Sequence, residues 1–137
     1  MRISPYLVFD ADCGDAFKFY QACLGGKLYV MTFGESPMAS ETPADKHGLV
    51  MHANLELDDG ALMGSDAPDG RYEQPVGTCV SIHVDSVDEA ERLYKSLSVG
   101  GTVQMELQET FWADRFGMFI DRFGTPWMIN CGKPDVT

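Results

Sequence analysis

The sequence predicts an α+β fold: one domain built from two tandem copies of a βαβββ module, residues 1–76 and 77–137. Three observations predict it: an internal repeat, two amphipathic helices that each stop at a Gly-Gly pair, and strands with alternating side chains. Placing Asp10 on Asp85 also places Gly26 on Gly101. Both copies have the same order of elements. Each begins with an apolar run, an acidic turn and a helix, continues with a strand, and ends with a glycine turn and an apolar strand.

Each copy contains one helix whose apolar residues recur at three- and four-residue spacing. In the first helix Asp12 is the expected N-cap and Gly25-Gly26 the expected stop. In the second, Ser86 followed by Glu89 fits a capping box, and Gly100-Gly101 is the expected stop. The stripes expected to pack on a sheet are Ala16, Phe19, Tyr20 and Cys23 in the first helix and Ala90, Leu93, Tyr94 and Leu97 in the second.

Two segments alternate between apolar and polar side chains, residues 50–57 (VMHANLEL) and residues 79–84 (CVSIHV). This alternation predicts strands with one face on a helix and the other face on a cavity or a partner. Residues 34–48 and 66–77 are rich in Pro, Ser, Glu and Asp and predict long loops. Such loops are either functional lids or plain surface excursions, and the sequence favours neither.

Composition excludes several classes of function. The 137-residue chain has a formal net charge of −11 and its basic residues are spread singly, whereas nucleic acid binding needs clustered Lys and Arg. No apolar run approaches the ~20 residues of a membrane span, and the N-terminus lacks a signal-peptide pattern, so we expect a cytoplasmic protein. Four scattered cysteines predict reduced thiols rather than disulfides or a zinc site. The expected partner is a small molecule or another subunit.

Three segments resemble the vicinal-oxygen-chelate (glyoxalase/bleomycin-resistance) superfamily, and within it the PhnB-like branch. They are residues 3–10 (ISPYLVFD), the F-Y-x-x-x-L-G helix end at residues 19–25, and residues 110–129 (TFWADRFGMFIDRFGTPWMI). This chain has Ala113 where the family has glycine, a small departure. The resemblance covers nearly the whole chain and implies curved mixed sheets around a small-molecule cavity.

Metal-dependent members of this superfamily place one His or Glu on the first and last strand of each module. The resemblance puts these four positions near Ser4 or Pro5, Gly64, Cys79 and Met128. None is a His or a carboxylate, and glycine or methionine cannot replace Glu for a hard cation. We therefore expect no metal cofactor at the family positions, with a divalent metal elsewhere as the alternative.

Polar residues follow three of those positions at even spacing, which points them to the cavity face. His83 and Asp66 are the expected catalytic groups, with His83 as the proton carrier. Ser81 and Asn130 are the expected ligand-binding groups beside them. The alternative is that His83 is an ordinary sheet histidine, satisfied by its neighbours or facing solvent.

Aromatic residues flank the charged pair Asp114-Arg115. Trp112 and Phe116, together with Phe111, predict a cavity wall in which Arg115 anchors an anionic ligand through paired hydrogen bonds. The alternative is core packing around a structural ion pair. Asp121 and Arg122, beside the glycine turn at Gly124, are expected to be structural.

Three further features have a plain interpretation and a functional one. His52, Asn54 and Glu56 form a second polar strand face, either solvated or a metal half-site. His47 is expected to be exposed in its loop. Cys79 lies at a metal-equivalent position, where a thiolate ligand or a nucleophile is the functional interpretation. We expect a buried, inert thiol instead, because no basic residue close in sequence would lower its pKa.

The sequence as a whole favours a small-molecule-binding protein of the PhnB-like family without the usual four-ligand metal site. The alternative is a metal-dependent enzyme, a lyase, isomerase or transferase that acts through an enolate or alkoxide. The sequence does not identify the ligand beyond a small molecule, for which Arg115 favours an anionic group. Because curved sheets leave apolar faces and edges that pairing covers, we also expect a homodimer.

Overall fold

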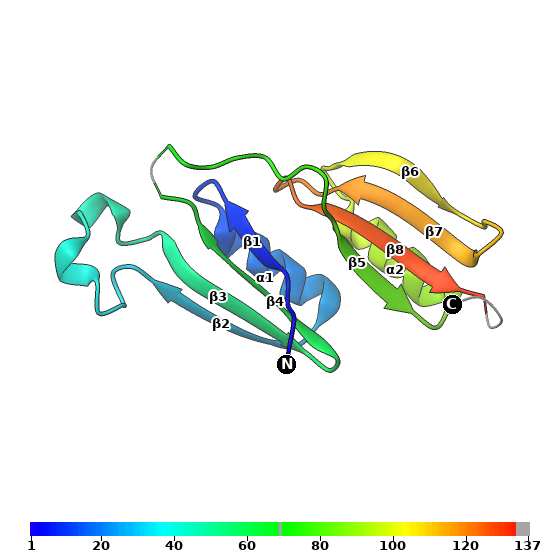
Figure 1. Cartoon of the computed structure of the whole chain (residues 1–137), viewed down its shortest axis with the longest axis horizontal. Coiled ribbons are helices and arrows are strands. Elements are labelled where there is room, and N and C mark those ends of the chain that lie inside the picture. Colours follow the sequence, from blue (N-terminus) through cyan, green and yellow to red (C-terminus); the bar gives the residue numbers. More distant parts are fainter. Residues whose placement is uncertain (69, 134–137) are drawn as a thin grey trace. The chain divides into compact units, whose positions relative to one another are not determined.

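The computed structural model describes residues 1–68 and 70–133. The chain divides into two compact units, Met1–Glu73 and Gln74–Thr137. Each unit contains one four-stranded mixed sheet and one α-helix (Figure 1). The predicted α+β class with two βαβββ modules is therefore confirmed. No helix in the described residues is long and apolar enough to span a membrane.

The first unit has the strand order β1-β4-β3-β2. β1 runs parallel to β4, and the other two pairs are antiparallel. The strand predicted for residues 50–57 is confirmed as β3. The elements are β1 (Tyr6–Phe9), α1 (Cys13–Leu24), β2 (Lys27–Thr32), β3 (Val50–Leu57) and β4 (Gly60–Asp66), with two short 3-10 turns, η1 (Ala39–Glu41) and η2 (Ala44–Lys46), between β2 and β3.

The second unit repeats this topology with the strand order β5-β8-β7-β6. β5 runs parallel to β8, and β8-β7 and β7-β6 are antiparallel. The strand predicted for residues 79–84 corresponds to β5, which starts one residue later. The elements are β5 (Val80–Val84), α2 (Val87–Leu97), β6 (Thr102–Gln108), β7 (Ala113–Ile120) and β8 (Pro126–Gly132).

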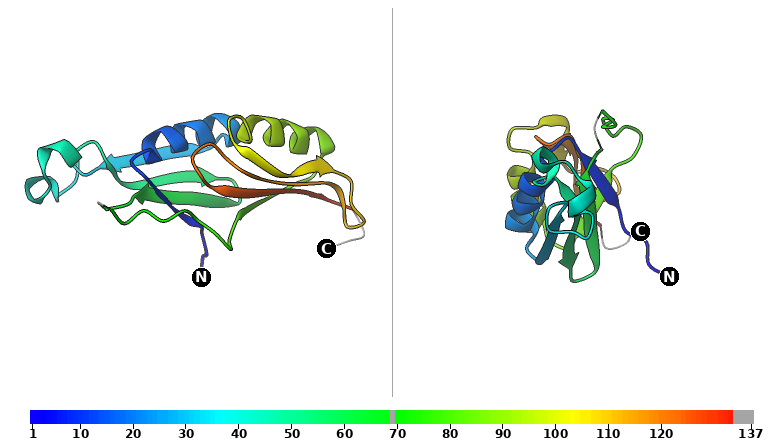
Figure 2. Two further views of the ribbon diagram at one scale, coloured as in Figure 1. Left: turned by 90° about the horizontal axis from the view of Figure 1, so that it is seen from above. Right: turned by 90° about the vertical axis from the view of Figure 1, so that its left-hand side faces the viewer.

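In each unit the helix covers one face of its own sheet (Figure 2). Of the stripe predicted for α1, Ala16, Tyr20 and Cys23 are buried and Phe19 is half-buried. Phe17, which the prediction omitted, is fully buried and meets Phe9 of β1 edge to face. This aromatic cluster is the core of the first unit.

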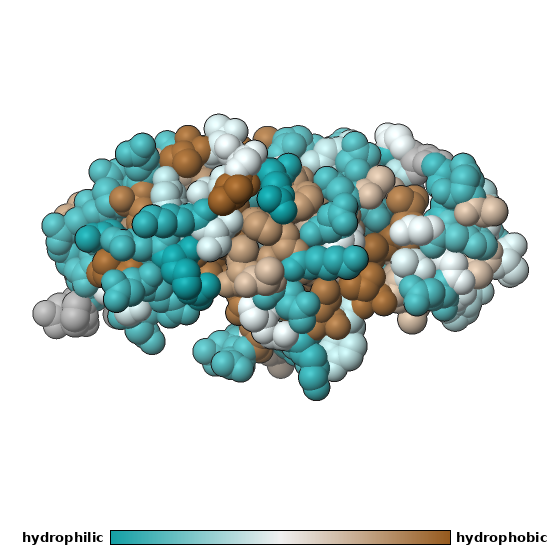
Figure 3. Space-filling model, turned by 180° about the vertical axis from the view of Figure 1, so that it is seen from behind, coloured by the Kyte–Doolittle hydropathy of each residue, from teal (hydrophilic) through white to brown (hydrophobic). Residues whose placement is uncertain are grey.

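α2 buries Ala90, Leu93 and Leu97 as predicted, while the half-buried Tyr94 packs edge to face on Phe119 of β7. Trp127, Phe119 and Ile129 are fully buried beneath the helix. The outer surface of α2 is mainly hydrophilic, as the view from behind Figure 1 shows (Figure 3). This division is typical of an amphipathic helix on a sheet.

The second glycine of each Gly-Gly pair lies where the chain leaves the helix and crosses a neighbouring strand. A Cβ at Gly26 would overlap the carbonyl oxygen of Glu56, and a Cβ at Gly101 would overlap the carbonyl oxygen of Ile120. Any residue larger than glycine at either position would collide with that oxygen, which explains why both copies of the repeat have glycine there.

The start of α1 is stabilised differently from the prediction. Asp12 occupies the N-cap position, but its side chain makes no capping bond. Asp66 at the end of β4 takes that role: Oδ1 accepts from the Cys13 N–H at 2.9 Å, and Oδ2 accepts from the Val50 N–H at 2.8 Å. Burial, with the Asp66 carboxylate nearby, raises the pKa of Asp12. The cap predicted at Ser86 is confirmed, because Ser86 Oγ accepts from the Glu89 N–H.

The loop between β2 and β3 is tied together by a histidine. His47 Nε2 lies 2.8 Å from the Thr42 carbonyl oxygen and 3.0 Å from the Ala39 carbonyl oxygen. The side chain is half-buried, so the prediction that His47 is exposed is wrong. The ring lies against two backbone carbonyl oxygens of the loop, and the composition of the loop does not reveal such a contact.

Replacing Asp66 tests the link between α1, β3 and β4. Asp66→Ala leaves two buried backbone N–H groups without acceptors, so we expect the free energy of unfolding to fall by about 2–5 kcal/mol in urea denaturation followed by circular dichroism. Asp59→Ala, in the exposed β3–β4 turn, is the control and should change stability little. Equal stability of Asp66→Ala and the wild type would contradict this role.

Candidate functional site

The face of the second sheet that α2 does not cover is called here the open face. Strand pairing orders its side chains in rows. His83, Asn130 and Phe116 form one row across β5, β8 and β7, and Ser81, Met128 and Met118 form the next. The buried residues Trp127, Ile129 and Phe119 alternate with them, which places the two rows opposite the helix.

Ser81, His83 and Asn130 form a hydrogen-bonded cluster on this open face. Asn130 Nδ2 lies 3.5 Å from His83 Nδ1, and Ser81 Oγ lies 3.1 Å from His83 Nε2. When Nδ1 accepts from the amide, the ring proton is on Nε2 and is donated to the serine hydroxyl. The structure thus brings together three of the predicted site residues.

The remaining polar atom of the cluster is unsatisfied. Asn130 Oδ1 is buried and has no hydrogen-bond partner. Such an atom is unusual, because a buried carbonyl oxygen without a donor destabilises the fold by about 1–3 kcal/mol. The Asn130 amide therefore leaves one buried acceptor beside His83.

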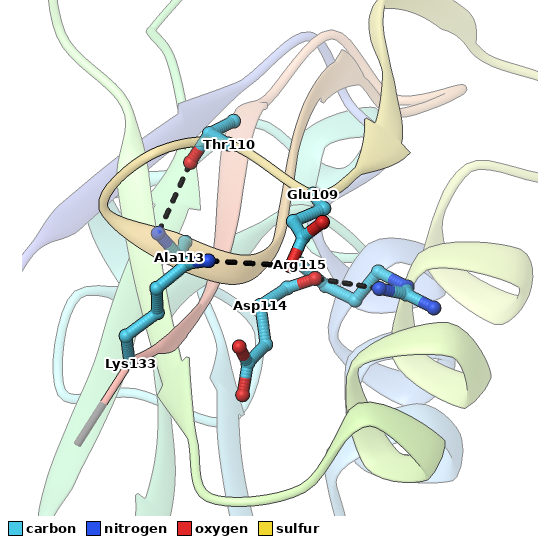
Figure 4. A network of polar contacts seen from close by, with 6 residues as sticks. All are labelled: Glu109, Thr110, Ala113, Asp114, Arg115 and Lys133. Carbon is cyan, nitrogen blue, oxygen red and sulfur yellow. Dashed lines mark hydrogen bonds and ion pairs between the residues drawn. The ribbon is translucent and has the colours of Figure 1, made fainter.

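Aromatic side chains border this cluster on the β7 side. Phe116 lies beside Asn130 in register and is buried, and the centroid of the Trp112 ring lies 5.2 Å from that of its ring. Phe111 stacks edge to face on Trp112 and is 87% exposed at the tip of the β6–β7 hairpin. The Thr110–Ala113 hydrogen bonds fix this tip (Figure 4). Phe116 therefore lies next to the polar cluster, with Trp112 packed on it.

Arg115 does not point to the open face. Side chains alternate along β7, so Arg115 lies on the same side as Phe119 and Gly117, which is the helix side. There its Nε lies 3.7 Å from Oε1 of Glu91 in α2. Its Nη1 donates to the Asp114 carbonyl oxygen, and Figure 4 shows the guanidinium turned toward the helix. The prediction that Arg115 binds an anionic ligand on this face is therefore wrong. Both side chains of the Arg115–Glu91 pair are partly exposed, so the pair adds little stability.

An apolar groove of about 340 Å³ continues the open face beyond the Met118 row. This volume is in the range of small-molecule pockets. Sequence reasoning missed this groove, although the alternation from Phe116 to Ile120 marks the same face. Its lining includes Val76, Cys79, Gln104, Met118, Ile120 and Pro126.

Cys79 is exposed at this groove, so the expectation of a buried thiol is wrong. It precedes β5, outside the part of the strand that packs beneath the helix. Cys13 and Cys131 are buried, and burial raises the pKa of the Cys13 thiol to about 12 and also raises that of Cys131. Those two thiols are correspondingly inert.

The first sheet has its own uncovered face. His52, Asn54 and Glu56 alternate along β3 on this face, as the pattern predicted, opposite the buried Ala53 and Leu55. Tyr6 of β1 stacks on His52, and its hydroxyl oxygen lies 3.3 Å from Nδ1 of that ring. Tyr29 of β2 lies beside Asn54 and is 52% exposed. Asn54 Oδ1 is buried without a partner, as Asn130 Oδ1 is.

Asp66 lies on the helix side of the first sheet and not on its uncovered face. It pairs in register with Phe9, which packs under α1, and its carboxylate is 5% exposed. A Cβ at Gly64 would meet Phe17 of α1 at 2.8 Å, so Gly64 also faces the helix. The predicted register of β4 was therefore off by one residue, which moved every side chain to the opposite face. Met63 and Ser65 take the positions expected for Gly64 and Asp66.

The residues present do not fit the family's four-ligand metal site. Met63 and Met128 occupy equivalent positions of the two sheets, paired with Tyr6 and Ser81, and a thioether is a poor ligand for a hard cation. His52 and Glu56 are four residues apart on one strand, roughly 13 Å, too far to share an ion. Over residues 1–68 and 70–133, no three His, Cys, Asp or Glu side chains form a group that could hold a metal ion.

Residues 2–129 match the family model described as the Glyoxalase/Bleomycin resistance protein/Dioxygenase superfamily. The chain belongs to this superfamily, and the predicted resemblance is confirmed.

Two proteins are similar to nearly the whole chain. Protein YjdN of Escherichia coli K12 is 38% identical over 147 residues, covering 100% of this chain and 99% of YjdN. The crystal structure of protein PA1353 from Pseudomonas aeruginosa is 48% identical, with a TM-score of 0.89 and coverage of 96% of this chain and 98% of that protein. A PhnB protein from Bacillus cereus shares the fold at a TM-score of 0.77 and 19% identity, covering 95% of this chain and 98% of its own.

Thiol labelling tests the burial of the four cysteines. With iodoacetamide under native conditions we expect Cys79 to react first, because the other three are buried and two of them have raised pKa values. Mass spectrometry of peptides would identify the labelled residue, and Cys79→Ser should abolish the early labelling. Rapid native labelling of Cys13 or Cys131 would contradict this placement.

Proposed function

We propose that this protein binds a small molecule on the open face of the second sheet, without a four-ligand metal site. The observation that carries the proposal is the Ser81–His83–Asn130 cluster beside the aromatic wall of Trp112 and Phe116. A few converging polar groups in apolar surroundings are the usual form of a small-molecule site.

The groove next to this cluster supports the proposal. Met118 belongs both to the row beside the cluster and to the groove lining, so the polar and apolar parts are continuous. A ligand with one polar end could contact both. Asp66 and Arg115, predicted as members of this site, are not included, because each side chain faces the helix of its own unit.

Within this proposal His83 is the proton carrier. It is exposed, and both of its ring nitrogens have polar neighbours that orient the ring. A histidine held in one orientation next to a ligand is suited to general acid–base chemistry near neutral pH. The same arrangement serves binding alone, with His83 as a hydrogen-bonding group.

A fragment screen by ¹H–¹⁵N NMR tests the location of the site. We expect the fragments that bind to shift the resonances of Ser81, His83, Asn130, Phe116 and Met118, because these side chains form the proposed surface. His83→Gln should weaken that binding, while Arg92→Gln, on the exposed side of α2, is the control. Fragments that shift only α2 resonances, or none at all, would rule out this site.

Metal analysis of the purified protein distinguishes a metal-free small-molecule-binding protein from a metal-dependent enzyme. We expect protein purified without chelators to contain far less than one equivalent of Zn, Ni, Mn or Fe, because the family positions offer methionine where a hard cation needs a carboxylate. A stoichiometric metal that is lost in His52→Ala or His83→Ala would instead support a metal-dependent lyase, isomerase or transferase.

We also propose a homodimer. Tyr6, Val8, Tyr29 and Met31 lie exposed on the uncovered face of the first sheet, and pairing with a second copy would cover such apolar side chains. Light scattering at micromolar concentration should give about twice the 15.1 kDa mass of the chain. A monomer mass across that range would contradict the proposal.

A further inference from the structure

We infer that the ligand of the second sheet is an elongated apolar molecule that carries a hydrogen-bond-donating hydroxyl or amine and no anionic group. This inference rests on the proposed site. It concerns the chemical class of the ligand, which follows from the atoms on the open face and from the placement of the basic side chains around it.

The acceptor is Asn130 Oδ1. Its amide nitrogen lies next to His83 Nδ1, and the oxygen has no partner. The side chain as a whole is only half-buried, so rotation about the Cβ–Cγ bond, a soft torsion, exchanges the contact between the amide nitrogen and His83 for a contact between the oxygen and a ligand at the surface. A ligand hydroxyl or ammonium group would satisfy this oxygen, whereas a carboxylate or phosphate would add a second acceptor against it.

Basic side chains that would favour an anion are held elsewhere in the second unit. Arg115 contacts Glu91 on the helix side, Lys133 Nζ lies 3.2 Å from Glu109, and the Arg122 guanidinium lies over the Phe123 ring. The other two basic residues of the described part of this unit, Arg92 and Lys95, lie on α2. Among the described residues of this unit, no Lys or Arg therefore lies at the Asn130 cluster, and His83 is the one basic side chain beside it.

The groove fixes the shape of the ligand. Met118, Ile120 and Pro126 line it with apolar atoms, and Ile120 lies four residues along β7 from Phe116, which is beside Asn130. Four residues of a strand span roughly 13 Å. An apolar body in the groove with a donor at Asn130 therefore needs an extended chain of about that length.

Three probes of the same shape separate the possible polar groups. They are 4-phenylbutan-1-ol, 4-phenylbutan-1-amine and 4-phenylbutyrate, which share a phenyl ring and a linear chain and differ in the terminal group. NMR titration, followed at the resonances of Asn130, His83 and Ile120, gives a dissociation constant for each. We expect the alcohol and the amine to bind about two- to tenfold more tightly than the carboxylate, the usual effect of one hydrogen bond.

Variants of Asn130 assign that preference to its side chain. Asn130→Leu should bring the alcohol and the carboxylate to similar affinity, and Asn130→Asp should favour the amine over the alcohol. Arg115→Ala is the control and should leave the order of the three probes unchanged, because its guanidinium faces α2. ¹H–¹⁵N spectra of each variant confirm that it is folded.

The outcomes distinguish the inference from the proposed function. Binding of all three probes at the groove, with the carboxylate tightest and weakened by Arg115→Ala, would overturn the ligand class and leave the site in place. Binding of none of them, or shifts confined to α2, would count against the site itself. A preference for the alcohol or amine that persists in Asn130→Leu would overturn the role of Asn130.

Discussion

The packing of one helix against one face of each sheet determines which side chains of this protein are available for chemistry. In the second unit α2 buries Trp127, Phe119 and Ile129, and alternation along β5, β7 and β8 then places His83, Asn130 and Phe116 on the other face. The polar cluster and the groove both depend on this register. A shift of one residue would exchange the core with the candidate site.

In the first unit the register depends on a buried carboxylate. Asp66 joins the first N–H of α1 to the first N–H of β3, so the end of β4 is fixed to two other elements by one side chain. The same residue looked from the sequence like a member of a catalytic pair. Its burial and its two backbone partners indicate a structural role instead.

The fold could be predicted from the sequence because the repeat, the Gly-Gly stops and the alternating strand β3 agree with one another. The register of β8 was also predictable, since Trp127, Ile129 and Cys131 alternate with polar or thioether side chains. β4 was not, because Ala61, Leu62 and Met63 are all apolar and either face could be buried. Alternation along β7 from the buried Phe119 places Arg115 on the helix side, whereas the prediction placed it with the aromatic residues that are its neighbours in the sequence.

Other features of the site depend on tertiary contacts that no sequence pattern contains. Exposure of Cys79, the groove beside Pro126 and the unsatisfied oxygen of Asn130 all arise from how strands and loops meet. Tyr6 and His52 are far apart in the sequence, and only the pairing of β1 with β4 and of β4 with β3 brings them into contact. Local periodicity identifies a face but not the partners on it.

The central claim is that Ser81, His83 and Asn130 act as one hydrogen-bonded group that leaves the Asn130 oxygen as an acceptor. The ring ¹⁵N shifts of His83, measured in long-range ¹H–¹⁵N spectra at alkaline pH, test it most directly. We predict the tautomer with the proton on Nε2 and with Nδ1 as the acceptor, and a change in its shift in Asn130→Leu. A ring protonated on Nδ1, or one whose shifts do not respond to Asn130→Leu, would contradict this account.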